Sequence, residues 1–225
     1  MRRLLRYVLV IAVVVLVFRA FHSSVGSDAV VDLPPQPQAQ KYDINLALVH
    51  RIECMNQKTG KGGIGTAWII GKNTLVTAAH VVDDICLDYD SQLPVTVKYI
   101  DRTNDLAIVV MDTGMETGSV TFGCNGFHTG HHYTATGWAD GETLRETMIE
   151  ADQFQTSKGT SIDNLPMVGL RYLKGMIYHG MSGGPIFDDQ GIAVGINTAT
   201  DELHPTQSFS RPLSDTILCG TPRRD

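Results

Sequence analysis

Beyond its first 20 residues, the sequence has no cluster of basic side chains. The chain of 225 residues carries 18 Lys and Arg against 24 Asp and Glu, a formal net charge of −6. Four of the cations are arginines within residues 1–20, where no acid occurs, so the remainder carries 14 basic against 24 acidic residues. Binding to phosphate backbones depends largely on clustered Lys and Arg. The charge pattern therefore argues against nucleic acid as a partner.

Cysteine is scarce, and no two cysteines form a C-x-x-C pair, so neither a redox motif nor a zinc ribbon has support. The four cysteines are Cys54, Cys86, Cys124 and Cys219. In an exported protein an even number permits two disulfides, and four cysteines allow three pairings.

One stretch is rich in possible metal ligands. It contains Cys124, His128, His131 and His132, spaced as C-x3-H-x2-H-H among glycines. This spacing matches no familiar zinc site, and a cysteine held in a disulfide could not act as a ligand. We therefore expect a solvated loop here, and we predict neither a metal nor a cofactor.

Long apolar runs are absent except near the N-terminus, where a basic start precedes the uninterrupted run at residues 7–18. This order is typical of an export segment. The run suits the core of a cleaved signal peptide, whereas residues 4–21 are long enough to span a membrane with Arg6 and Arg19 near the interfaces. Arg19, directly after the core, favours the anchor.

We therefore expect residues 1–21 to form a membrane-targeting helix, either a signal-anchor or a signal peptide. The rest of the protein would then be a periplasmic or otherwise extracytoplasmic domain held at the membrane, or a secreted one after cleavage. Residues 22–41 are rich in Pro and Gln and predict an extended linker, which leaves residues 42–225 for a folded domain.

Helical periodicity is absent after residue 20. Instead, short β-like runs alternate with turn residues along the chain. In the first run one face of a half-buried strand is predicted to carry Leu46, Leu48, His50, Ile52 and Cys54. Many short strands of this kind indicate an all-β sandwich or barrel, and periodicity alone does not distinguish the two.

A serine lies within a run of glycines, Gly-Met-Ser-Gly-Gly-Pro at residues 180–185. Glycines adopt φ values that other residues resist, so the hydroxyl of Ser182 could be exposed beside backbone N–H groups that bind a developing oxyanion. Taken alone, a serine in such a run is more often a turn residue. A nucleophilic serine also needs a base, and His80 ends a β-like run among small residues.

Three segments together resemble the chymotrypsin-like serine peptidase clan, and they occur in that clan's order. They are Thr-Ala-Ala-His at residues 77–80, Asn-Asp-Leu-Ala-Ile at 104–108 and the glycine run at 180–185. Gly-Trp at 137–138 and Gly-Ile-Asn-Thr at 195–198 resemble two further marks of the clan, the second especially of its bacterial high-temperature-requirement branch. The similarity covers about residues 44–215.

The resemblance implies two six-stranded antiparallel β-barrels, the first at about residues 42–115 and the second at about 116–218. It implies a serine endopeptidase that acts on polypeptides, with a triad of His80, Asp105 and Ser182. Ser182 would be the nucleophile, His80 the general base and Asp105 the group that orients the imidazole.

Two backbone N–H groups, those of Gly180 and Ser182, would form the oxyanion hole by the same resemblance. The walls of the specificity pocket would be Ile177, Ala199 and Thr200, which favours small aliphatic side chains at the cleaved position.

The chain departs from the pancreatic-type pattern at two positions. Met181 replaces the acid that there pairs with a newly cut N-terminus, and Met176 replaces the acid at the base of a tryptic pocket. A preference for Lys or Arg therefore lacks its counter-charge. Few residues follow Ser182, so we expect no peptide-binding module of the kind that the bacterial branch often adds.

Two other functions stay open, a catalytically silent protease-like domain that binds a partner and an esterase. For the cysteines we predict Cys54 with Cys86 and Cys124 with Cys219, because each pair would then lie within or close one half of the molecule. The sequence indicates no oligomeric state.

Overall fold

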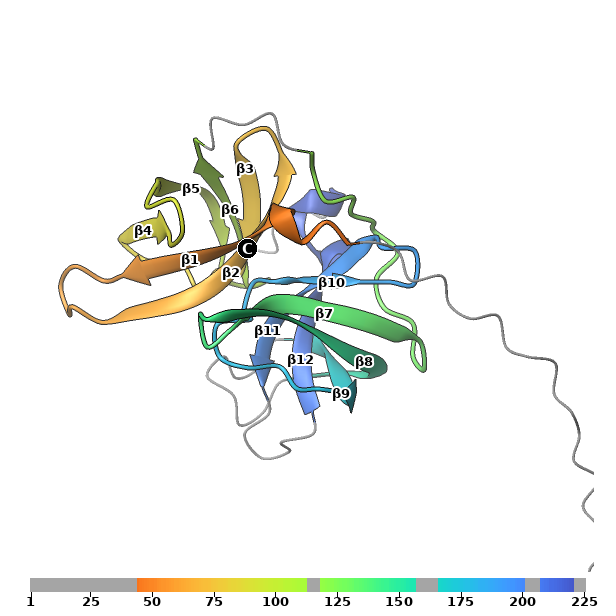
Figure 1. Ribbon diagram of the computed structural model, residues 1–225. Coiled ribbons are helices and arrows are strands. Elements are labelled where there is room, and N and C mark those ends of the chain that lie inside the picture. The colour runs from red at the N-terminus through yellow and green to blue at the C-terminus, as the bar shows by residue number, and fades with distance from the viewer. Residues whose placement is uncertain (1–43, 113–117, 157–165, 201–206, 221–225) are drawn as a thin grey trace, which may run out of the picture. The chain divides into compact units, whose positions relative to one another are not determined.

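A computed structural model describes residues 44–112, 118–156, 166–200 and 207–220 (Figure 1). The predicted targeting helix at residues 1–21 and the linker at 22–41 lie outside these ranges. Within them, no helix has both the length and the apolar character needed to cross a membrane.

The described residues form two closed barrels, each of six antiparallel strands (Figure 1). The strand orders are β1-β2-β3-β6-β5-β4 and β10-β11-β12-β9-β8-β7. The first barrel comprises β1 (Val49–Met55), β2 (Gly62–Gly71), β3 (Thr74–Thr77), β4 (Ile85–Asp88), β5 (Pro94–Asp101) and β6 (Leu106–Met111). The second comprises β7 (His132–Ala139), β8 (Thr143–Thr156), β9 (Pro166–Lys174), β10 (Pro185–Phe187), β11 (Ala193–Thr200) and β12 (Gln207–Pro212). The predicted all-β fold with two six-stranded barrels is confirmed.

Helical structure in the described part of the chain is limited to short 3-10 turns. These are η1 (Leu46–Leu48), η2 (Leu213–Asp215) and η3 (Ile217–Cys219). The first turn replaces the start of the strand that the sequence predicts at residue 46. The side chain of Asn45 accepts a hydrogen bond from the N–H of Ala47 at 3.2 Å, which favours a turn over an extended chain.

The first strand therefore begins at Val49, and its buried face differs in part from the predicted one. Val49, which the alternation places on the opposite face, is 4% exposed, while His50 is half-buried. Ile52 and Cys54 are buried as expected.

Two clusters of buried apolar side chains form the core. The first centres on Trp68 and includes Phe187 and Ile196 of the second barrel, so the two barrels share it. The second lies in the second barrel and includes Ile177 and Met181. This shared packing fixes the junction between the barrels, because interiors are close-packed and resist rearrangement.

All four cysteines are paired, and the predicted pairing is confirmed. Cys54 and Cys86 are opposite each other on the neighbouring strands β1 and β4. Cys124 of the connection between the barrels is bonded to Cys219 of η3. The first disulfide therefore lies within one barrel, while the second ties the inter-barrel connection to the end of the described chain.

Candidate functional site

His80 and Asp105 lie together at the ends of two paired strands. β3 pairs with β6, with Thr77 opposite Ala107, so the segment that follows β3, with His80 three residues past its end, lies next to Asp105, the residue just before β6. The ring Nδ1 of His80 is 2.9 Å from Oδ2 and 3.0 Å from Oδ1 of Asp105. The backbone N–H of His80 also donates to Oδ1 at 2.9 Å. The carboxylate thus holds both the ring and the backbone of the histidine.

Asp105 is buried, with 2% exposure, and its backbone has a φ of +50° in the left-handed region. The preceding turn supports this conformation, because the carboxylate of Asp101 accepts the N–H groups of Thr103 and Asn104. A non-glycine residue in this region carries strain that the surroundings must offset. The side chain of His80 is 29% exposed, so the imidazole remains partly accessible.

Ser182 lies in a tight loop before β10, between two glycines with left-handed backbones. Gly180 and Gly183 both have a φ of +84°. A Cβ atom at Gly180 would lie 2.4 Å from the carbonyl oxygen of Trp138, and one at Gly183 would lie 2.3 Å from Oγ1 of Thr77. Both positions therefore require glycine, as the sequence suggested.

The backbone N–H groups of Gly180 and Ser182 donate to no acceptor within the part of the chain that the structure describes. Neighbouring backbone groups, in contrast, do form hydrogen bonds. The carbonyl of His179 accepts the N–H of Asp140 at 2.6 Å. Since a trans peptide points its C=O and N–H in opposite directions, this contact turns the N–H of Gly180 away from Asp140.

Thr66 of β2 connects the first barrel to this loop, a role that the sequence analysis missed. Its hydroxyl donates to the carbonyl of Gly180 at 2.7 Å and accepts the N–H of Trp138 at 2.9 Å. Its own N–H donates to the carbonyl of Ser182 at 2.8 Å. The available signal was a polar residue inside the apolar run at residues 64–70.

Met181 packs beneath the loop and is fully buried in the core of the second barrel, together with Ile177. Its backbone lies so close to β7 that a Cβ atom at Gly137 would come within 2.8 Å of its Cα atom. Packing thus supports the loop where the sequence lacks an acid.

A cavity of about 780 Å³ is lined by residues of both barrels and by all the predicted site residues except Asp105, which lies behind His80. His80, Gly180 and Ser182 line it, and so do the predicted pocket walls. Those walls are Ile177, Ala199 and Thr200. The sequence analysis missed several lining residues, among them Lys61, Asp83, Asp140, Tyr178 and His179. Loop residues of this kind carry no periodicity that places them at a cavity.

The histidine-rich stretch is arranged differently from a metal site. Cys124 is bonded to Cys219, so its thiolate is not a ligand. In the described ranges no three His, Cys, Asp or Glu side chains are grouped to hold a metal ion. The hydroxyl of Tyr133 accepts the N–H of His128 at 2.8 Å, and burial raises the pKa of that phenol above its ordinary value.

A family model described as trypsin-like peptidase domain matches residues 65–196. The chain belongs to this family. This trypsin-like peptidase chain resembles Serine protease HTR4 of Rattus norvegicus, with 27% identity over 164 residues. The match covers 69% of this chain and 33% of that relative, so this chain spans about a third of the relative's length. The family model thus shows a trypsin-like peptidase domain, and the similar rat protein is itself called a serine protease.

Solved structures show the same fold. The active form of the Rv3671c protease from M. tuberculosis has a TM-score of 0.67 and 18% identity, over 86% of this chain and 90% of that one. The HtrA-type protease AlgW, solved with a tripeptide, has a TM-score of 0.60 and 22% identity, over 76% of this chain and 57% of that one. The resemblance to the chymotrypsin-like clan and its high-temperature-requirement branch is confirmed.

Proposed function

We propose that this trypsin-like peptidase hydrolyses peptide bonds with Ser182 as nucleophile, His80 as general base and Asp105 as the orienting group. One observation supports this most directly. His80, bound through Nδ1 to the buried carboxylate of Asp105, lines the same cavity as Ser182.

In the first half of the reaction, the hydroxyl oxygen of Ser182 attacks the carbonyl carbon of the peptide bond, and Nε2 of His80 takes the hydroxyl proton. The carbonyl oxygen becomes an oxyanion. It accepts hydrogen bonds from the N–H groups of Gly180 and Ser182, which have no acceptor among the described residues. The tetrahedral species then expels the amine, which leaves with the proton from His80.

In the second half, water attacks the acyl-enzyme and His80 again takes the proton. The same N–H groups stabilise the second oxyanion, and its collapse releases the acid while His80 returns the proton to the oxygen of Ser182. The carboxylate of Asp105 stabilises the imidazolium that forms in each half, because both of its oxygens lie within 3.0 Å of Nδ1.

Small aliphatic side chains fit the proposed specificity pocket best. Ile177, Ala199 and Thr200 line the cavity, and Met176 supplies no charge for a basic side chain. Each methylene would change the activation free energy by about 1–3 kcal/mol. Peptides that differ only at the cleaved residue test this, and faster cleavage after Lys than after Val would refute it.

The two disulfides favour an oxidising compartment outside the cytoplasm. Export through residues 1–21, with or without a retained anchor, is part of this proposal, as is a polypeptide substrate.

The triad is tested by substitution. Ser182→Ala and His80→Ala should each lower kcat for peptide hydrolysis by about six orders of magnitude, and Asp105→Asn by about four. Asp88→Asn is the matched control, because Asp88 also binds a histidine but does not line the cavity. Full activity of Ser182→Ala would overturn the assignment.

A further inference from the structure

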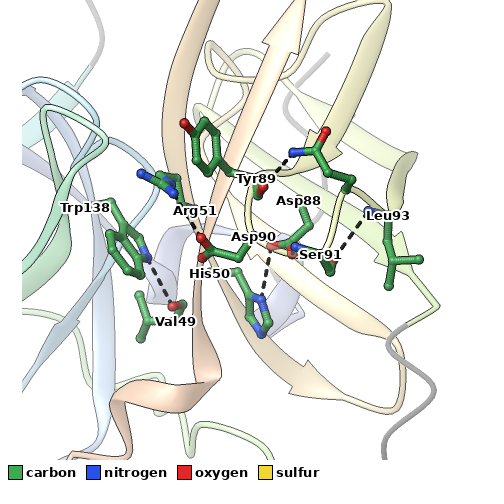
Figure 2. Close-up of polar contacts among 10 residues, drawn as sticks. Val49, His50, Arg51, Asp88, Tyr89, Asp90, Ser91, Leu93 and Trp138 are labelled. Atoms are coloured by element: carbon green, nitrogen blue, oxygen red, sulfur yellow. Dashed lines mark hydrogen bonds and ion pairs between the residues drawn. The ribbon is translucent and has the colours of Figure 1, made fainter.

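Arg51 of β1 holds its guanidinium in an enclosed position, with a side chain only 12% exposed. The guanidinium lies between two aromatic rings, 3.3 Å from the centroid of Tyr89 and 5.1 Å from that of Trp138 (Figure 2). Its Nη2 pairs with the carboxylate of Asp90 at 2.9 Å. Its Nη1 donates a hydrogen bond to the backbone carbonyl of Gly141. Four contacts thus fix this cation, although it does not line the cavity.

The carbonyl that Arg51 holds belongs to the hairpin turn between β7 and β8. Asp140 and Gly141 both have left-handed backbones, with φ of +52° and +69°. The turn is closed by the N–H of Gly141, which donates to the carbonyl of Trp138 at 3.3 Å. The indole Nε1 of Trp138 in turn donates to the carbonyl of Val49 on β1 at 3.2 Å (Figure 2). The N–H of Glu142 also donates to the carbonyl of Ala139 at 3.0 Å, so residues 139–142 form a β-turn whose two central residues are left-handed, as hairpin turns favour. The contacts from β1 attach this turn to the first barrel.

This turn contacts the loop before Ser182 directly. The N–H of Asp140 donates to the carbonyl of His179 at 2.6 Å, which sets the direction of the next N–H, that of Gly180. A Cβ atom at Gly180 would lie 3.0 Å from the backbone nitrogen of Gly141. Movement of the turn would therefore rotate or displace the Gly180 peptide.

We propose that Arg51 is a positioning residue for the oxyanion-binding N–H of Gly180. It connects the rigid first barrel to the turn at residues 138–142, and the turn holds the peptide between His179 and Gly180. This inference rests on the proposed function of Gly180. Arginine suits the position better than lysine, because a flat guanidinium can stack between two rings and still donate to two acceptors.

The test compares Arg51→Gln with the unaltered chain in peptide hydrolysis. A shift of the Gly180 N–H weakens binding of the oxyanion but not of the substrate, so kcat should fall about tenfold to a hundredfold with KM within about twofold. The kcat of Arg51→Lys should fall less, because an ammonium group can reach one acceptor but cannot stack between the two rings. Arg171→Gln is the matched control, because Arg171 forms an exposed ion pair with Glu150 on the second barrel.

Two inhibitors separate positioning from a general loss of structure. A peptide aldehyde forms a tetrahedral adduct with an oxyanion, whereas the corresponding peptide alcohol does not. Arg51→Gln should weaken aldehyde binding by about the same factor as kcat and leave alcohol binding unchanged. If Arg51→Gln melts below the assay temperature, the ratio of aldehyde affinity to alcohol affinity is measured in Arg51→Lys instead. Equal weakening of both inhibitors, or an unchanged kcat, would overturn the proposal.

Amide hydrogen exchange provides a readout that does not depend on activity. The N–H groups of residues 178–182 should exchange faster in Arg51→Gln than in the unaltered chain. Faster exchange in a chain that neither hydrolyses peptides nor reacts at Ser182 would support the link while refuting the proposed function. If exchange and the inhibitor ratios are both unchanged in an active enzyme, the positioning role of Arg51 is refuted and the proposed function is not.

Discussion

Two histidines of the first barrel contact carboxylates, but only one of them faces the cavity. His80 binds Asp105 and lines the cavity together with Ser182, whereas His50 binds Asp88 at 3.2 Å (Figure 2) and neither of these two residues lines the cavity. The chemistry of the two pairs is alike, so the difference between them is their place in the fold. Access to a shared cavity, more than the histidine–carboxylate contact itself, distinguishes a candidate catalytic pair from a structural one.

The contact between His50 and Asp88 predicts an acid-sensitive part of the stability. Burial alone would raise the pKa of Asp88, but hydrogen bonds from His50 and Ser91 outweigh it and hold the pKa below its ordinary value of 3.8. The stabilisation is therefore present above about pH 4 and is lost as the pH falls through the lowered pKa. Asp88→Asn should lower the free energy of unfolding by about 1–3 kcal/mol at pH 7 and by progressively less below pH 4.

Denaturant unfolding of the unaltered chain and of Asp88→Asn, from pH 7 to pH 3, checks this prediction. Thr216→Ala serves as a control, because the buried hydroxyl of Thr216 donates to the backbone carbonyl of Leu213 at 2.8 Å, a hydrogen bond without a titratable partner. A penalty for Asp88→Asn that stays constant across this range would show that the carboxylate charge contributes nothing.

Among single residues, the sequence could propose His80, Asp105 and Ser182 as a triad, because their flanking residues resemble family motifs. It could not identify Thr66 or Arg51. Their roles arise from contacts across more than 70 positions, with Trp138, Gly141 and Gly180 as partners. No local pattern encodes such a contact, because pairing across barrels depends on the assembled fold.

The backbone of strand β7 presses against the loop that carries Ser182. A Cβ atom at Gly137 would lie 2.8 Å from the Cα atom of Met181 and 3.0 Å from its carbonyl oxygen. Neither backbone atom can move aside without displacing the loop.

Gly137→Ala should therefore lower kcat about tenfold to a hundredfold, because it displaces Ser182, and destabilise the fold by about 1–3 kcal/mol. Gly71→Ala is the matched control, because Gly71 also lies in a strand but a Cβ atom there meets nothing within 4 Å. It should change stability by less than about 0.5 kcal/mol. Steady-state kinetics and thermal melting compare Gly137→Ala with Gly71→Ala. Equal kcat and equal Tm in the two variants would show that β7 does not support the loop.

At the scale of the elements, alternation predicted strands well but misplaced the start of β1. The turn η1 forms because the side chain of Asn45 competes for a backbone N–H. Side-chain capping of this kind is local, yet its outcome depends on packing of Leu48 in the core.

For the whole molecule, the fold places the site where two barrels meet and share one core. Sequence periodicity indicated only an all-β class, and the resemblance was needed to predict two barrels of six strands. The disulfide pairing followed from assigning each pair to one half of that fold. The predicted export segment lies outside the described residues and stays a prediction.

Activity should not depend on a freshly cut N-terminus. The side chain of Met181 is fully buried and uncharged, so it cannot pair with a terminal ammonium group. A chain beginning at Lys41 and one with additional residues before it should therefore cleave a peptide with the same kcat and KM. An inert longer chain that becomes active after trimming would show that the loop needs such an ion pair.

The central claim is that Ser182 is a nucleophile activated by His80, and covalent labelling tests it most directly. A fluorophosphonate should form one adduct, located on Ser182 by peptide mapping and mass spectrometry. His80→Ala should label far more slowly, and Ser182→Ala should not label at that peptide. Absence of an adduct in the folded, disulfide-bonded chain, or an adduct at another serine alone, would contradict the account.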